Sequence, residues 1–385
     1  MLIAGFAPLS KRFFRGVMCL FNNVLFGRVL NKRVPDGPLF VSWVLTYDCN
    51  AFCTFCGTHR LKKQFAETIS EKRAIKIADE IARFGTWVVG FTGGEVFLSP
   101  LLFPLIRRLK QHGLVVYVVT NGRNLQDHAK DLVDIGLDFV VVSLDTDKAE
   151  VHDELRKSDG LFNDAVEGIL EIRRLRGSHG PIIKTNTVLM RENIEHSDRI
   201  LKFLRSIADR VEVQPIAFDY TNSPHNRDKN RVDRFLVDDF GSAVVDKYLS
   251  ENVVPFADGS KSYIKRFSDY WFDSQKLAEK IACWAPFLRM QILPNGDVMH
   301  CAANPRFGAV GNVNKDNILN VWNSAEIRKH RAIIGRKKNN CTCWTKDTSF
   351  NNLIHDVRIP NLLPAIGPKE EDLEQAVAGN KEPLK

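Results

Sequence analysis

The sequence predicts an α/β fold in which helices cover a parallel sheet. Two patterns support this prediction: six short apolar runs have the composition of strands, and they are separated by stretches in which apolar residues recur every three or four positions. Such alternation is typical of βα units that share one sheet. The length of 385 residues, with 44% hydrophobic and 26% charged residues, suits a barrel-sized domain plus a smaller one and excludes a wholly disordered chain.

The expected elements follow one another in a regular order. Strands are expected near residues 40–46, 87–92, 114–119, 138–143, 182–190 and 211–217. Helices are expected near residues 70–84, 101–112, 125–135, 161–176 and 195–208, and again near 236–250 and 262–281. Ligands of parallel α/β folds bind at the carboxyl ends of the strands. The polar residues of this chain gather at those ends, so we expect the functional site there.

Residues 1–39 form a basic segment with an amphipathic helix near 13–29. Six basic residues stand against one acid, so the segment holds five of the eight net positive charges, and no nucleic-acid partner is expected from the remainder. The longest apolar run, residues 17–21, is too short to cross a bilayer, which takes about 20 residues. Three interpretations stay open: the helix lies flat on an anionic membrane, packs its apolar face on the domain, or is a cleaved transit peptide.

Three cysteines follow the first expected strand within eight residues: Cys49, Cys53 and Cys56. One loop can turn all three sulfurs inward, which indicates a metal site. Three thiolates are one short of the four ligands of zinc or a four-iron cluster, so either His59 completes a structural zinc site or one position stays open for chemistry. The clustered cysteines and the lack of a signal peptide predict a cytoplasmic protein.

The second expected strand runs directly into Gly93-Gly94-Glu95. Two glycines allow close approach of the backbone to a ligand, and a carboxylate can hold an amine. The cysteine motif followed by Gly-Gly-Glu, each at a strand end, resembles the radical S-adenosylmethionine (SAM) enzymes. The resemblance implies that the three cysteines hold three irons of a [4Fe–4S] cluster and that SAM chelates the fourth. It also implies a partial TIM-like (βα)6 barrel over about residues 40–220.

The same resemblance implies contacts to SAM, which are expectations for this chain. Glu95 with Gly93 and Gly94 would receive the amino group, and Phe55 and Leu189 would lie beside the adenine. Asn121 and Ser143 would contact the ribose and carboxylate, and Arg156 would pair with the carboxylate. Each polar residue also has an ordinary explanation, as a turn, a helix cap or a surface ion pair. No catalytic side chain is assigned.

A second group of cysteines lies near the end of the chain: Cys283, Cys301, Cys341 and Cys343. Between the first two, Asn295-Gly296 separates two apolar runs and predicts a hairpin. The pattern resembles the SPASM/twitch extension of radical SAM enzymes, which implies a small α+β domain over residues 283–350 with one auxiliary [4Fe–4S] cluster as an electron relay or clamp. Zinc is the alternative metal. Residues 221–282 are expected to connect the domains over the barrel mouth, and residues 351–385 to form a solvated tail.

The resemblance implies that the chain cleaves SAM to a 5′-deoxyadenosyl radical, which takes a hydrogen atom from an organic substrate; the outcome is an oxidation, a crosslink or a new bond. An electron donor such as flavodoxin or ferredoxin is expected. The basic helix favours a membrane-associated or lipid-linked substrate and peripheral contact with the membrane. Forty residues are too few for a winged-helix peptide-binding module, which argues against a peptide-modifying maturase. A non-catalytic iron–sulfur or zinc protein is the contrasting class.

Overall fold

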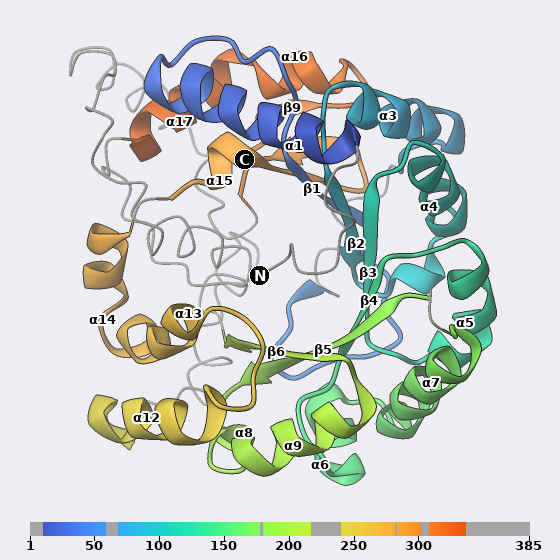
Figure 1. Cartoon of the computed structure of the whole chain (residues 1–385), viewed down its shortest axis with the longest axis vertical. Helices are drawn as coiled ribbons and strands as arrows, with labels where there is room; N and C mark the ends of the chain where they lie inside the picture. Colours follow the sequence, from blue (N-terminus) through green and yellow to red (C-terminus); the bar gives the residue numbers. More distant parts are fainter. Residues whose placement is uncertain are drawn as a thin grey trace, which may run out of the picture.

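The computed structural model describes residues 11–58, 68–177, 180–216, 240–281, 283–301 and 308–335. These residues contain a nine-stranded sheet with the order β6-β5-β4-β3-β2-β1-β7-β8-β9. Figure 1 shows that the sheet curves and that helices α3, α4, α5, α7 and α9 lie along its outer side. The prediction of a parallel α/β sheet in a partial (βα)6 barrel is therefore confirmed.

The barrel strands are β1 (Phe40–Thr46), β2 (Val88–Gly93), β3 (Val115–Thr120), β4 (Phe139–Ser143), β5 (Ile182–Leu189) and β6 (Arg210–Pro215). Each strand pairs in parallel with the next one along the chain, so the six carboxyl ends meet at one edge. The strands are rich in Val and Ile because a parallel sheet covered by helices is buried on both faces. Val140 and Val142 of β4, for example, have no exposed surface.

The helices expected between the strands are present as α3 (Glu71–Arg83), α4 (Leu102–Gln111), α5 (Leu125–Asp134), α7 (Leu161–Leu175) and α9 (Ser197–Ile207). In α3, the Ser70 hydroxyl accepts a hydrogen bond from the amide of Arg73 at 3.4 Å and so caps the first turn. Two short helices have no counterpart in the sequence expectation: α6 (Ala149–Arg156) and α8 (Arg191–Ile194). Helices this short show too few turns for a periodic pattern.

The C-terminal extension continues the barrel sheet. The predicted hairpin is present, since β7 (Arg289–Ile292) pairs antiparallel with β8 (Asp297–Met299) and Gly296 turns the chain with φ +85°. The parallel pairing of β7 with β1 was not expected, and it joins the extension to the first barrel strand. β9 (Gly311–Asn312), α15 (Ala285–Leu288), α16 (Ile318–Trp322) and α17 (Ala325–Gly335) complete the described part of this extension.

Between barrel and extension the chain is helical, as the sequence predicts. It forms α12 (Ser242–Tyr248), a short π-helix η5 (Leu249–Val253), α13 (Lys261–Lys265) and α14 (Phe267–Lys280). These helices lie beside β6, at the open side of the barrel (Figure 1). Residues 217–239, which the sequence places over the mouth, are outside the described residues.

The N-terminal helix is oriented with its apolar face outward. α1 (Lys11–Asn22) continues into the π-helix η1 (Asn23–Val29). Small residues occur on its inner face, where the backbone at Gly16 lies against the ring of Trp87 just before β2. Four apolar side chains on the other face are about half exposed: Phe14 (55%), Val17 (46%), Met18 (54%) and Phe21 (56%). Leu20 and Val24 instead pack on the cluster of Trp284, Phe287 and Leu288. The interpretation that the helix packs its apolar face on the domain is therefore wrong for the four exposed residues and holds for Leu20 and Val24.

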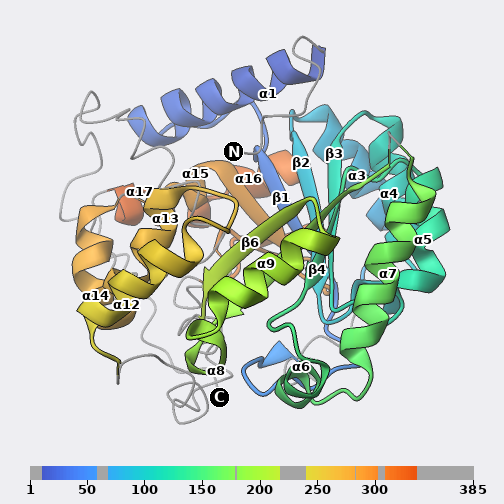
Figure 2. The ribbon, with the colours of Figure 1, turned by 60° about the horizontal axis from the view of Figure 1, so that its bottom comes forward.

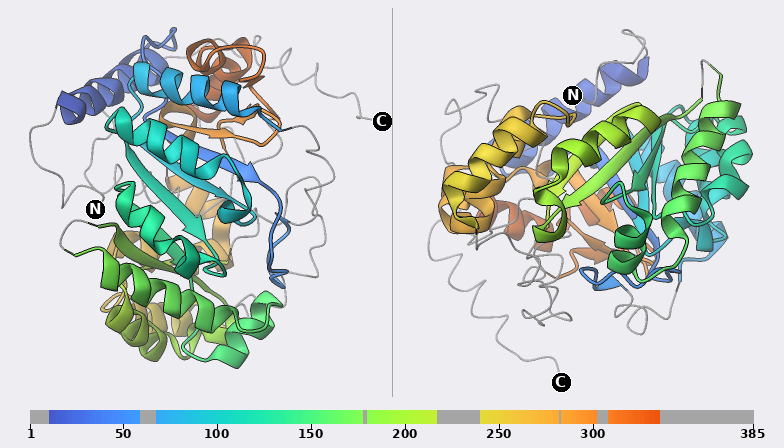
Figure 3. Two further views of the ribbon diagram at one scale, coloured as in Figure 1. Left: turned by 90° about the vertical axis from the view of Figure 1, so that its right-hand side faces the viewer. Right: turned by 90° about the horizontal axis from the view of Figure 1, so that it is seen from below.

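α1 lies at the end of the barrel opposite to the predicted site. Trp87 and Gly85, which it contacts, precede β2, so α1 covers the amino ends of the first strands. Figure 2 shows α1 at one end of the barrel strands and α6 at the other end. The two views of Figure 3 place α1 along the outer surface of the molecule. Among the described residues, no helix combines the length and apolar character needed to cross a membrane.

Candidate functional site

The cysteine loop follows β1 and docks on α6. The amide of Phe52 donates to the carbonyl of Arg156 at 3.0 Å, and the amide of Thr54 donates to the carbonyl of Leu155 at 2.8 Å. The last turn of a helix has free carbonyl groups, and these two bonds use them. The loop is therefore fixed at the carboxyl edge of the sheet by a helix that the sequence pattern did not reveal.

The three cysteines lie together in an apolar setting. Cys53 is buried, with 9% of its surface exposed, and Cys49 and Cys56 are half-buried. Ala51, Leu161 and Phe55 pack around them. Burial, opposed by the charge of Arg156 and assisted by the charges of Cys56, Asp145 and Cys49, raises the pKa of Cys53 to about 12. Ligation must therefore displace protons from this loop.

The donor set at the start of the barrel is three thiolates on one loop. An iron–sulfur cluster binds its thiolates on separate irons, so three thiolates suit a cluster with one iron left without a protein ligand. A structural zinc ion takes four ligands, one more than this loop supplies among the described residues. His59, the fourth ligand of the zinc alternative, is outside the described residues.

Gly93 and Gly94 allow two segments of the backbone to come into contact. A Cβ atom at Gly94 would lie 2.0 Å from the carbonyl oxygen of Asp48, and one at Gly93 would lie 2.2 Å from that of Thr46. Gly93 also has φ +137°, which disfavours other residues. The amide of Gly94 donates to Thr46 at 2.8 Å and that of Glu95 to Asp48 at 2.7 Å. The backbone of the two glycines therefore approaches the backbone at the start of the cysteine loop. The sequence argument had placed a ligand at this position.

Glu95 is fully buried and its carboxylate is already hydrogen-bonded inside the protein. It accepts from the Thr120 hydroxyl at 2.8 Å, from the amide of Asn121 at 2.8 Å and from the amide of Phe97 at 3.3 Å. Burial raises the pKa of Glu95, and these hydrogen bonds limit the rise. The side chain thus ties the end of β2 to the end of β3. Its predicted contact with the amino group of SAM stays a prediction.

Asn121 connects β3 to the cysteine loop. Its Nδ2 donates to Oδ1 of Asn50 at 2.8 Å and lies 3.8 Å from Sγ of Cys49. Its Oδ1 accepts from the amide of Arg123 at 2.9 Å, which fixes the orientation of the amide group. The carboxylate of Glu95 holds the backbone of the same residue. Asn121 is therefore placed by three contacts beside the first cysteine.

Arg156 is buried beneath the cysteine loop and paired with Asp145. Its Nε and Nη2 donate to Oδ2 of Asp145 at 3.0 and 2.7 Å, and its Nη1 lies 4.0 Å from Sγ of Cys53. The guanidinium carbon is 5.8 Å from the centre of the Phe55 ring. Arg156 is therefore already paired with a carboxylate of the protein, that of Asp145. The sequence assigns Arg156 to the carboxylate of SAM. That assignment stays a prediction.

Two features hold this pair in place: the burial of Asp145 and the contact of His152, a residue that sequence reasoning did not select. Asp145 has no exposed surface, and its Oδ1 also accepts from the amide of Val188 at 3.0 Å. His152 lies one turn before Arg156 on α6, and its Nδ1 accepts from the amide of Asp145 at 3.4 Å. Burial and the Arg156 charge lower the pKa of His152 to about 2, so the ring is neutral. The signal for His152 was its four-residue spacing from Arg156.

The other predicted contacts lie at the same edge of the sheet. Ser143 is half-buried at the end of β4, where it pairs with Asn186 of β5. Leu189 ends β5 and is buried, with 1% of its surface exposed. Phe55 is half-buried between the cysteines and the core. Of the eight residues expected at SAM, seven lie at strand ends or in the loops that follow them, and Arg156 lies at the end of α6. Their contacts with SAM stay predictions.

The cysteines of the extension are described only in part. Cys283 precedes α15 and Cys301 follows β8, and both are half-buried. Cys341 and Cys343 are outside the described residues. The ligand set of four thiolates stays a prediction. The two described cysteines lie at the two ends of the segment that contains α15, β7 and β8.

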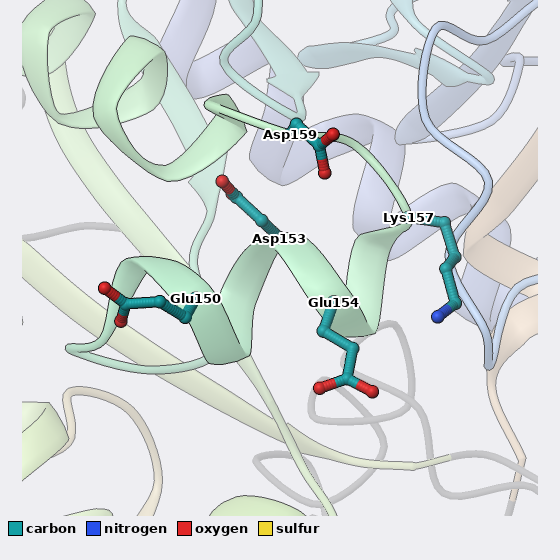
Figure 4. A pocket seen from close by; sticks show the side chains of 5 residues that line it. All are labelled: Glu150, Asp153, Glu154, Lys157 and Asp159. Atoms are coloured by element: carbon teal, nitrogen blue, oxygen red, sulfur yellow. The ribbon is translucent and has the colours of Figure 1, made fainter.

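A hollow beside α6 is lined by Glu150, Asp153, Glu154, Lys157 and Asp159. Figure 4 shows that these side chains do not converge: Asp153 and Asp159 lie on one side of the helix, and Glu150 and Glu154 point elsewhere. The carboxylate of Asp153 accepts from the amides of Gly160 and Phe162, at 2.6 and 2.9 Å. Its role is to hold the α6–α7 turn, so this hollow is not the candidate site.

Comparison with known proteins supports the same organisation. Residues 43–204 match the family model of the radical SAM superfamily, and residues 283–345 match that of SPASM, an iron–sulfur cluster-binding domain. The solved structure of Streptococcus suis SuiB bound to precursor peptide SuiA shares the fold. Its TM-score is 0.59 at 15% identity, and the match covers 89% of this chain and 77% of that one.

Two curated relatives illustrate the range of the sequence match. GTP 3′,8-cyclase of Limosilactobacillus fermentum is 32% identical over 192 residues, which are 49% of this chain and 55% of the relative. The antilisterial bacteriocin subtilosin biosynthesis protein AlbA of Bacillus subtilis is 24% identical over 301 residues, which are 76% of this chain and 61% of the relative. This chain spans little more than half the length of these two relatives.

The two matched domains also define the cofactors. The radical SAM domain uses a [4Fe–4S] cluster and SAM, and the SPASM domain binds auxiliary iron–sulfur clusters. The three cysteines after β1 and the described cysteines of the extension lie inside these matched ranges. The chain therefore carries a radical SAM domain over residues 43–204 and a SPASM domain over residues 283–345.

Proposed function

We propose that this chain is an enzyme that cleaves SAM reductively at the cysteine loop and takes a hydrogen atom from an organic substrate. The observation that carries the proposal is the placement of three clustered cysteines at the carboxyl edge of the sheet, beside the glycines and Asn121. The products expected from SAM are methionine and 5′-deoxyadenosine. The outcome for the substrate is an oxidation, a crosslink or a new bond.

The protein contributes positioning and exclusion of water. Cys49, Cys53 and Cys56 would hold the cluster, which when bound would supply the electron for the reductive cleavage of SAM. Asp145 holds Arg156 with one nitrogen toward Cys53, and Glu95 holds the backbone of Asn121. Leu161, Ala51 and Phe55 surround the sulfurs with apolar groups, which lowers the local dielectric constant. The side chains therefore act by fixing the positions of the charged and polar groups around the three sulfurs.

Two substrate classes are supported by different observations. AlbA takes part in bacteriocin biosynthesis, and the SuiB structure contains a precursor peptide, which supports a peptide substrate and a maturase function. A lipid-linked substrate was favoured by the basic helix. That helix lies at the amino ends of the strands, so a membrane beneath it would face away from the site. We therefore place peptides first among the substrates to be tested.

The exposed face of α1 supports contact with an anionic membrane surface. Phe14, Val17, Met18 and Phe21 form an apolar stripe, and no acidic residue occurs between Lys11 and Pro35. Basic residues near such a stripe attract anionic headgroups while the apolar side chains enter the interface. Membrane contact would leave the carboxyl edge of the barrel open to the aqueous phase, where an electron donor such as flavodoxin or ferredoxin could approach.

The function is tested by anaerobic reconstitution with iron, sulfide and SAM, with dithionite as reductant. The expected product is 5′-deoxyadenosine, and a deuterated substrate of the correct class transfers deuterium into it. A Cys53→Ala variant should lose this activity while the extension keeps its iron. Deuterated peptides, lipids and sugars are compared in the same assay. Intact clusters without 5′-deoxyadenosine would favour the contrasting class, a non-catalytic iron–sulfur protein.

A further inference from the structure

Arg28 links the N-terminal segment to the first cysteine of the extension. It belongs to η1, and its Nη1 donates to the carbonyl oxygen of Cys283 at 3.3 Å. Its guanidinium carbon lies 4.2 Å from the ring centre of Trp284 and 5.0 Å from that of Phe287. The planar cation is therefore held over two aromatic faces immediately beside Cys283.

A second arginine reaches the same region from α17. Arg331 is buried, with 1% of its surface exposed, and its Nε donates to the carbonyl oxygen of Pro286 at 2.8 Å. Its guanidinium carbon lies 4.4 Å from the centre of the Trp322 ring. It is also close enough to His300, the residue before Cys301, for its charge to act on that imidazole. Arg28 and Arg331 thus lie near the two described cysteines of the extension.

Neither guanidinium forms an ion pair with a carboxylate in the part of the chain that the structure describes. Nη1 and Nη2 of Arg331 are buried and have no hydrogen-bond partner among the described residues. Arg156, the other buried arginine among the described residues, has Asp145 as its counter-ion. A buried cation without a counter-ion is costly, so an anion is expected nearby. An iron–sulfur cluster held by thiolates carries net negative charge and would satisfy that expectation.

We propose that Arg28 and Arg331 are the counter-charges of the auxiliary cluster and that they raise its reduction potential. Reduction adds a negative charge to the cluster, so a fixed cation nearby stabilises the reduced form more than the oxidised one. This deepens the proposed function, on which it rests for the identity of the metal group, by assigning an electron-accepting role to the extension. The N-terminal segment thereby becomes part of the redox site.

The competing explanation is that Arg28 only clasps the N-terminal segment to the aromatic pair. The two explanations differ for lysine, which keeps the positive charge but loses the planar stacking. They also differ for Arg331, which does not belong to that segment. Arg33 is a suitable control, because it is an exposed arginine of the same segment that contacts Asn320 at 3.0 Å.

The test uses the full chain with Cys49, Cys53 and Cys56 replaced by Ala, so that only the auxiliary cluster is observed. Into this background we introduce Arg28→Met, Arg28→Lys, Arg331→Met and Arg33→Met separately. Iron and sulfide per chain are measured, and the midpoint potential is followed by EPR during redox titration. Arg28→Met and Arg331→Met should each lower the reduced-to-oxidised ratio about tenfold at the parent midpoint, a shift of about 59 mV for one electron. Arg28→Lys should shift less, and Arg33→Met should not shift.

An unchanged midpoint in both Met variants with full iron content would overturn the proposal. So would an equal shift in Arg33→Met, zinc in place of iron, or loss of the cluster in every Arg28 and Arg331 variant, which would make these residues structural clasps. If only Arg28→Met loses the cluster, the midpoint potentials of Arg28→Lys and Arg331→Met decide between the two explanations. The titration needs no SAM cleavage, so a chain that shows these shifts but makes no 5′-deoxyadenosine would refute the proposed function alone.

Discussion

Asp145 is the residue on which the geometry beneath the cysteine loop most depends. Its two oxygens accept from Arg156 and from the backbone of Val188, and none of its surface is exposed. A buried ion pair contributes little net stability by itself, but removing one partner leaves a buried charge without compensation. The pair therefore fixes the position of the Arg156 guanidinium, 4.0 Å from Cys53, more than it stabilises the fold.

Replacement of Asp145 by Asn should lower the free energy of unfolding of the apo-protein by about 3 kcal/mol, because Arg156 would keep its charge in a buried site. Urea unfolding measures the change. Asp134→Asn is the control, since Asp134 pairs with Lys130 at the surface and should cost less than about 1 kcal/mol. Equal stability of the two variants would show that the buried pair does not restrain Arg156.

His152 should make the protein sensitive to acid. Its pKa is about 2 in the folded protein and about 6.5 when unfolded, so below pH 6.5 the unfolded chain binds an additional proton. Stability is therefore lost as pH falls from about 6.5 toward 2, by about 1.4 kcal/mol per pH unit from this residue. His152→Gln should reduce the slope of unfolding free energy between pH 6 and 4 by this amount, whereas the exposed His196→Gln should not. Parallel slopes for wild type and His152→Gln would contradict the argument.

At the scale of elements, α1 shows how a helix can be inserted with its apolar side outward. Small or polar residues recur on its inner side, where Asn23 donates to the carbonyl of Gly37 at 2.9 Å and accepts from the indole of Trp322 at 2.9 Å. These contacts fix one face to the barrel and the extension. The remaining face is left with four large apolar side chains at helical spacing.

Phe14→Ser together with Phe21→Ser should weaken binding to vesicles that contain phosphatidylserine by at least about tenfold. Each Phe side chain contributes roughly 1.5–3 kcal/mol when it is fully buried in an apolar phase. Flotation with and without phosphatidylserine measures the effect. The control is Leu170→Ser, because Leu170 is an exposed apolar residue of α7 at 47%. Equal flotation of the double variant and wild type would rule out this face as the membrane contact.

At the scale of the whole molecule, the sheet was predictable and its long-range contacts were not. Continuous Val and Ile runs mark strands that are buried on both faces, so the six barrel strands were located to within two residues at their beginnings. Asn295-Gly296 likewise located the β7–β8 hairpin. The pairing of β7 with β1 joins segments far apart in the sequence, and no local pattern records it.

In the candidate site, too, the local motifs were predictable from the sequence and the long-range contacts were not. The motifs located the cysteines and the glycines, because their spacing is local. The partners of Glu95 and Arg156 were missed, since Thr120 and Asp145 come close only after the strands align. The direction of α1 was left open because periodicity defines two faces without saying which is covered. The three-to-four-residue spacing of Gly16, Cys19, Asn23 and Gly27 was the signal that could have indicated the inner face.

The central claim is that an iron left without a protein ligand at the cysteine loop binds SAM. The most direct measurement is the EPR spectrum of the reduced, anaerobically purified chain before and after addition of SAM, with Cys283 and Cys301 replaced by Ala to silence the extension. The account predicts about four irons and four sulfides at the remaining site and a changed spectrum on addition of SAM. Zinc without inorganic sulfide, or a cluster spectrum unaffected by SAM, would contradict it.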